Sequence, residues 1–132
     1  MSSDEDKGME PDVLASSLRE GLEETQDLLD FLAMKFEGPL SHLMTVRRKG
    51  GLFSKKSSVH EITLRFDDRH FQISRDSRGF VSAKIMKEVR GIVLKTELVE
   101  VEEWIRHLAQ ELARQAERSA AMRSALSQFI LE

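Results

Sequence analysis

Apolar residues recur with helical spacing between residues 11 and 37. The apolar stripe advances in steps of three, four or seven residues, which places its members on one face of a helix: Leu18, Leu22, Leu29, Leu32 and Phe36. Pro11 suits a first helical turn, and Asp12 favours the positive end of the helix dipole. Gly38–Pro39 is a stop signal. The pattern predicts one amphipathic helix that ends near residue 38.

The middle of the chain alternates apolar and polar residues with a period of two, which is typical of strands with one buried face. The four alternating segments are "HEITLRF" (60–66), "RHFQISR" (69–75), "FVSAKIM" (80–86) and "GIVLKTEL" (91–98). Turn signals separate them at Asp67–Asp68, at residues 76–79 and at Arg90–Gly91. The pattern predicts a four-stranded antiparallel meander.

The register of each hairpin follows from its turn, because a buried face requires apolar residues to oppose apolar residues. A two-residue turn at Asp67–Asp68 sets Leu64 opposite Phe71 and Ile62 opposite Ile73. A three-residue loop at 76–78, with Gly79 free to adopt positive φ, sets Ile73 opposite Val81 and Phe71 opposite Ala83. A turn at Glu88–Val89 sets Ile85 opposite Ile92 and Ala83 opposite Leu94. All three hairpins then share one apolar face.

A second helical pattern runs from about Glu100 to Ile130, with acidic residues in its first turn. Its apolar stripe weakens at Gln115–Ser119 and then recovers. A helix of about thirty residues spans ~45 Å, whereas a seven-residue strand spans ~23 Å, so the helix is longer than the sheet. We therefore expect its second half to contact either the first helix or a second copy of the chain. The expected dimerisation residues are Met122, Leu126, Phe129 and Ile130.

The remaining segments complete the predicted organisation. Residues 1–10 form an expected disordered acidic tail, and residues 11–132 a single α+β domain with the order α-β-β-β-β-α. The segment "LSHLMTV" (40–46) fits either a short helix or an edge strand. A basic loop follows at 47–58.

Charge is distributed unevenly along the 132 residues, although the net charge is only −3. Residues 1–43 carry eleven acidic and three basic side chains, and residues 44–78 carry nine basic and four acidic ones. The acidic and basic blocks favour either self-complementarity or an anionic partner.

The basic stretch of residues 47–56 is the candidate partner-binding segment. It combines five cations with two apolar side chains: Arg47, Arg48, Lys49, Leu52, Phe53, Lys55 and Lys56. Three interpretations stay open, namely a plain solvated loop, a docking segment for a protein, and a binding segment for an anionic membrane surface. We do not expect nucleic-acid binding by the outer sheet face, because stacking aromatic residues are missing from its middle.

The sequence contains no candidate catalytic or metal site. It lacks cysteine and tyrosine, and its four histidines, at positions 42, 60, 70 and 107, do not fall at ligand spacing. We predict no cofactor and no enzymatic activity. The absence of cysteine, the acidic N-terminus and the lack of a long apolar run predict a cytoplasmic protein.

In size and layout, a small acidic chain with a twisted antiparallel sheet and a terminal amphipathic helix is similar to the dimeric chaperones of bacterial secretion systems. No motif accompanies this resemblance. It implies an adaptor, accessory or chaperone-like protein. We therefore expect a homodimeric protein-interaction module, with peripheral binding to an anionic membrane surface or to nucleic acid through residues 47–56 as the alternative.

Overall fold

The computed structural model describes residues 10–25, 28–48 and 59–131, with all their side chains except those of residues 21–25 and 128–131. The chain divides into two compact units. One comprises residues 27–104, and the other combines residues 1–26 with residues 105–132. The α+β class and the antiparallel sheet are confirmed, while the single domain over residues 11–132 stays a prediction.

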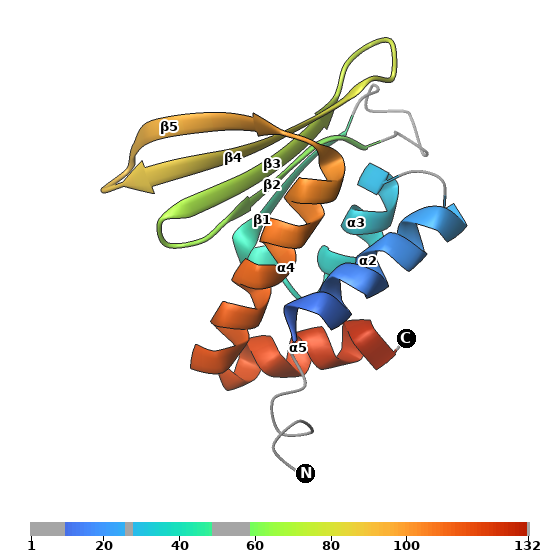
Figure 1. The fold of residues 1–132 in the computed structure, drawn as a ribbon, viewed down its shortest axis with the longest axis vertical. Helices are drawn as coiled ribbons and strands as arrows, with labels where there is room; N and C mark the ends of the chain where they lie inside the picture. Colours follow the sequence, from blue (N-terminus) through green and yellow to red (C-terminus); the bar gives the residue numbers. More distant parts are fainter. Residues whose placement is uncertain (1–9, 26–27, 49–58, 132) are drawn as a thin grey trace. The chain divides into compact units, whose positions relative to one another are not determined.

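The unit of residues 27–104 contains a five-stranded antiparallel sheet (Figure 1). Its strands are β1 (Met44–Arg48), β2 (Val59–Arg65), β3 (Arg69–Arg75), β4 (Val81–Val89) and β5 (Ile92–Val99), and they lie in chain order. The prediction of four strands was wrong by one. The segment 40–46 adopts both predicted forms in succession, because a 3-10 helix at Ser41–Leu43 leads directly into β1. β1 and β5 are therefore the two edges of the sheet.

The helix α3 (Leu28–Phe36) packs against β2 in this unit. Its six buried side chains are all apolar: Leu28, Leu29, Phe31, Leu32, Ala33 and Phe36. Asp30 Oδ1 accepts a hydrogen bond of 3.3 Å from the Val59 amide, which ties the helix to the start of β2. On β2, Ile62 and Leu64 are fully buried.

The centre of this core is aromatic. The Phe71 ring makes edge contacts with Phe66 and Trp104, with ring centroids 5.8 and 6.2 Å apart. Trp104 Nε1 also donates a hydrogen bond of 3.1 Å to the Lys84 carbonyl on β4. Phe71 and Trp104 are fully buried, so these contacts hold β3 and β4 in place.

The first hairpin has the predicted register, with Leu64 opposite Phe71 and Ile62 opposite Ile73. In the second hairpin the predicted register was wrong by two positions, since Ile73 lies opposite Ala83 and Phe71 opposite Ile85. A shift of two keeps the same face buried. The loop is longer than predicted because Asp76 organises it: Asp76 Oδ1 accepts hydrogen bonds of 2.9 Å from the amides of Arg78 and Phe80. Gly79 adopts the predicted positive φ, at 91°.

The register predicted for the third hairpin was wrong by five positions. The turn lies at Arg90–Gly91 rather than at Glu88–Val89, and Val89 pairs with Ile92. Both turn residues have positive φ, 52° and 83°, as a two-residue type I′ turn requires. Ile85 then opposes Glu97 and Ala83 opposes Val99. Leu98 accordingly lies on the outer face, opposite Lys84.

The second unit is helical, and it contains α2 (Pro11–Thr25), α4 (Val101–Arg118) beyond Trp104, and α5 (Ala120–Leu131). The predicted single helix over residues 100–130 was wrong, because the chain ends one helix and begins another at Ser119. Ser119 Oγ accepts a hydrogen bond of 3.1 Å from the Met122 amide, the N-terminal cap of a new helix. Arg123 Nε donates to the Ala116 carbonyl at the end of α4. Likewise, two helices, α2 and α3, stand where the pattern predicted one.

Candidate interaction surface

The strand β5 forms an open edge of the sheet. It has eight residues, and among the described strands it pairs with β4 alone. Seven of its side chains are exposed and Val99 is half-buried. An edge strand presents unpaired N–H and C=O groups along its open side. β5 therefore has the backbone of a binding strand.

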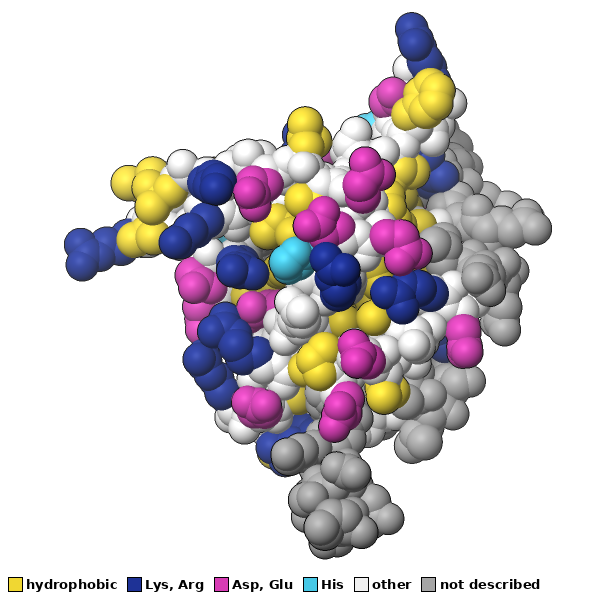
Figure 2. All heavy atoms as spheres, viewed as in Figure 1, with side chains coloured by type: hydrophobic (Ala, Val, Ile, Leu, Met, Phe, Trp, Pro, Cys, Tyr) yellow, Lys and Arg dark blue, Asp and Glu magenta, His cyan; other side chains and the backbone are white. Residues whose placement is uncertain are grey.

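Exposed apolar side chains concentrate on β5 and the segments that flank it. Of the nine large apolar side chains that are exposed in the described parts of the chain, seven lie between residues 80 and 98: Phe80, Val81, Val89, Ile92, Val93, Leu94 and Leu98. Leu94 is 61% exposed and Leu98 is 73% exposed. Figure 2 shows hydrophobic side chains at the tip of the β4–β5 hairpin. Exposed apolar side chains gathered at one place, as at this tip, are the usual mark of an interaction surface.

The exposure of Leu94 and Leu98 follows from the register of the third hairpin. The pairing shifts between Lys87 and Glu88, so Lys87 opposes Lys95 while Glu88 opposes Val93. Leu94 is the additional residue of this bulge. Apolar residues thus reach both sides of β5, whereas a strand with one buried face would keep them on one side.

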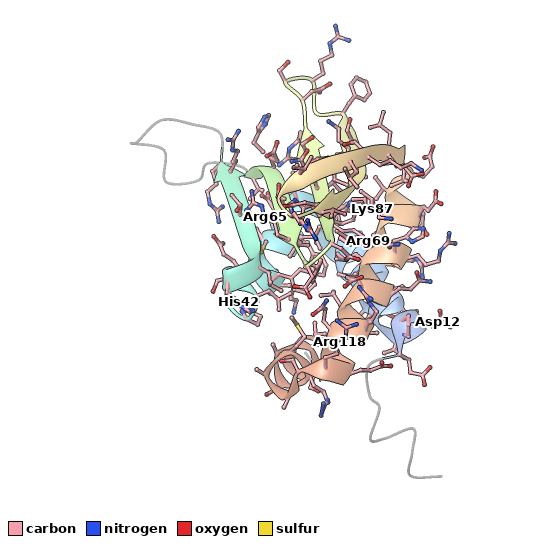
Figure 3. All side chains as sticks on the ribbon, turned by 90° about the vertical axis from the view of Figure 1, so that its left-hand side faces the viewer. Asp12, His42, Arg65, Arg69, Lys87 and Arg118 are labelled. Atoms are coloured by element: carbon pink, nitrogen blue, oxygen red, sulfur yellow. The ribbon has the colours of Figure 1, made fainter. Side chains whose placement is uncertain are left out.

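Two opposite charges lie in the middle of β5. Lys95 Nζ is 3.5 Å from Glu97 Oε2, and both side chains are more than half exposed. Lys95 also continues a row of cations across the sheet, since Lys95 opposes Lys87 and Lys87 opposes Arg69. Figure 3 labels Arg69 and Lys87 in this row. Like charges directly opposite each other destabilise a strand pair, so this row favours a carboxylate at the open edge.

A contact between His70 and Glu88 fixes β4 beside the bulge. His70 Nε2 faces Glu88 Oε1, and both side chains are mostly buried. That oxygen accepts no hydrogen bond of regular geometry, so the two side chains are in close contact without a regular hydrogen bond. The Glu88 amide also donates a hydrogen bond of 3.0 Å to the Asp68 carbonyl. β4 is therefore anchored beside the bulge in its pairing with β5.

The two sets of predicted binding residues belong to different units of the chain. Arg47 and Arg48 end β1 and are exposed, and Arg48 Nη2 forms an ion pair of 2.8 Å with Glu37. The other five members of the basic segment, Lys49, Leu52, Phe53, Lys55 and Lys56, lie outside the described residues. Binding of a protein or an anionic surface by this segment stays a prediction.

The predicted dimerisation residues lie on α5. Met122 is 7% exposed and Leu126 is 1% exposed within the single chain. These two side chains offer little surface to a second copy. The side chains of Phe129 and Ile130 lie outside the described part of the structure. The β5 edge exposes far more apolar surface than Met122 and Leu126 do. The sequence did not identify this edge as a binding surface.

Among the described residues, no three His, Asp or Glu side chains group closely enough to hold a metal ion. No described helix combines the length and the hydropathy that crossing a bilayer requires.

Comparison with known proteins gives no assignment, because no family model, no curated protein and no solved structure matches the chain.

Proposed function

We propose that this chain is a non-enzymatic protein-interaction module, of the adaptor or chaperone-like kind, which binds an extended segment of a protein partner along β5. The observation that carries the proposal is an eight-residue edge strand with an open backbone edge and exposed apolar side chains on both faces. Strand addition to a sheet edge uses these two features together, because backbone hydrogen bonds supply affinity and alternate side chains supply specificity.

The free energy of binding should favour an apolar, extended partner. Each backbone hydrogen bond contributes a net ~1 kcal/mol. The hydrogen bonds of several residues together do not offset the conformational entropy that a flexible peptide loses when it is ordered. Burial of apolar surface adds ~25 cal/mol per Å². Leu94 and Leu98 supply the exposed apolar surface for this term. Binding should therefore depend on both leucines.

A displayed library of short random peptides, selected against the full chain, tests this function. We expect enrichment of peptides with alternating apolar residues that bind the wild type and fail to bind a Leu94→Lys/Leu98→Lys variant. Phe80→Lys is the matched control, since the exposure of Phe80, 67%, lies between those of Leu94 and Leu98, but Phe80 lies outside β5. Peptides that bind the wild type and the leucine variant equally would refute the β5 edge as the binding site.

A further inference from the structure

We infer that β5 pairs with β5 of a second copy of this chain, antiparallel and about a two-fold axis at Thr96. This inference rests on the proposed function and names its partner. In this arrangement Lys95 of each copy lies opposite the partner's Glu97, and Leu94 lies opposite the partner's Leu98. The occupant of the edge is thus defined by the charges and apolar residues of β5 itself.

Backbone geometry restricts the possible arrangements. Residues directly opposite in an antiparallel pair either both direct their hydrogen-bonding groups inward or both direct them outward. Two copies of one strand can therefore pair only about an axis that passes through a residue, because an axis between two residues would match an inward residue with an outward one. The regular part of β5 lies beyond the bulge residue Leu94, which leaves the residues from Lys95 to Leu98 as possible axes.

Charge selects one of these axes. An axis at Lys95 places Lys95 against itself, and an axis at Glu97 places Glu97 against itself, and directly opposed like charges are destabilising. An axis at Leu98 places both charged residues opposite residues without charge. Only the axis at Thr96 pairs Lys95 with the partner's Glu97, twice by symmetry.

The same axis also matches the other side chains. It places Thr96 opposite the partner's Thr96, a favourable cross-strand pair. It covers Leu94 of each copy with the partner's Leu98. Both leucines are among the most exposed apolar side chains described. It also brings the partner's Glu97 next to the cation row of Arg69, Lys87 and Lys95. Charge, apolar burial and backbone geometry therefore favour one register.

Charge reversal at Lys95 and Glu97 tests this register. Lys95→Glu alone places the acidic residues at 95 and 97 of each copy opposite the acidic residues at 97 and 95 of the partner. Glu97→Lys alone places basic residues opposite basic residues at the same positions. Each single variant should therefore weaken the homodimer by about tenfold or more. The double variant Lys95→Glu/Glu97→Lys should recover the wild-type dimer. A mixture of the two single variants should form a heterodimer, because its strands regain opposite charges at all four positions. Arg78→Glu, in the β3–β4 loop, is the control with the same change in net charge as Lys95→Glu.

Sedimentation velocity at low ionic strength measures the dissociation constants, and thermal unfolding by circular dichroism verifies that each variant is folded. Weaker dimers of both single variants, together with recovery in the double variant, support the register, because an axis at Lys95, Glu97 or Leu98 does not give this combination. A wild type that stays monomeric at high concentration, or dimers unaffected by either reversal, would overturn self-pairing. If the peptide selection nevertheless yields ligands that require Leu94 and Leu98, the proposed function stands with another protein as its partner. If both experiments fail, the proposed function falls as well.

Discussion

The two edges of the sheet differ in almost every property that governs strand addition. β1 has five residues, two of which are arginines, and its register with β2 shifts between those arginines. Short length, positive charge and bulges all discourage pairing with another chain. β5 has eight residues, and its exposed positions include Ile92, Leu94 and Leu98. One sheet thus has one protected edge and one open edge.

The side-chain bonds of β1 add to this difference. Arg48 forms its ion pair with Glu37, and Arg65 Nη1 donates a hydrogen bond of 2.8 Å to Thr45 Oγ1. Both bonds attach β1 to its own unit. The charges of β5, in contrast, contact only each other among the described ion pairs. β1 is thus a protected edge strand, whereas the edge of β5 is open.

Removing the core beneath both edges should have the largest effect. Phe71→Ala deletes a fully buried ring in contact with Phe66 and Trp104, and it should lower the free energy of unfolding by about 3–5 kcal/mol. Because β3 lies between the two edges, β1 and β5 should lose their amide protection together. Urea unfolding measures the loss. An unchanged unfolding midpoint would show that this aromatic cluster does not support the sheet.

Gly91→Ala should weaken the open edge selectively. Gly91 has φ of 83°, where an alanine is strained, although its added Cβ would meet no atom closer than 3.9 Å. The strain should cost about 1 kcal/mol. Amide exchange should accelerate in the β4–β5 hairpin and stay unchanged in β1. Gly38→Ala is the control, because Gly38 has open space around its Cβ position and no positive φ. Equal effects of the two substitutions would contradict the type I′ turn.

Arg48→Ala should have the smallest effect. The lost ion pair with Glu37 joins two side chains that are 42% and 49% exposed. Exposed pairs contribute about 0.2–1 kcal/mol, and salt screens them. Thermal unfolding at low and high salt should show a small difference from the wild type that disappears at high salt. A large loss of stability at both salt concentrations would show that β1 depends on more than this surface pair.

The sequence predicted the parts of the fold that local signals determine. The β2–β3 register is correct because Asp67–Asp68 leaves only one two-residue turn that keeps Leu64 and Phe71 on the same face. The β4–β5 register was wrong because β5 is apolar at both parities, so a buried face cannot be distinguished by alternation. The Arg90–Gly91 signal contained the missing information, since a type I′ turn centred there gives the observed pairing of Val89 with Ile92.

The helix break at Ser119 has a similar explanation. A serine inside a helical pattern either continues the helix or caps the next one, and the spacing of apolar residues is compatible with both. Because the break was missed, the far end of the predicted helix was expected to need a partner. The structure instead buries Met122 and Leu126. The surface that is open lies on β5, where exposure depends on strand order and register rather than on any local motif.

The most direct test of the open edge is the amide hydrogen exchange of β1 and β5 as a function of protein concentration. If β5 pairs with β5 of a second copy, exchange of the β5 amides should slow as concentration rises, with protection centred on Thr96. Exchange in β1 should not change. Exchange rates of β5 that are independent of concentration, or protection that appears in β1 or α5 instead, would contradict this pairing.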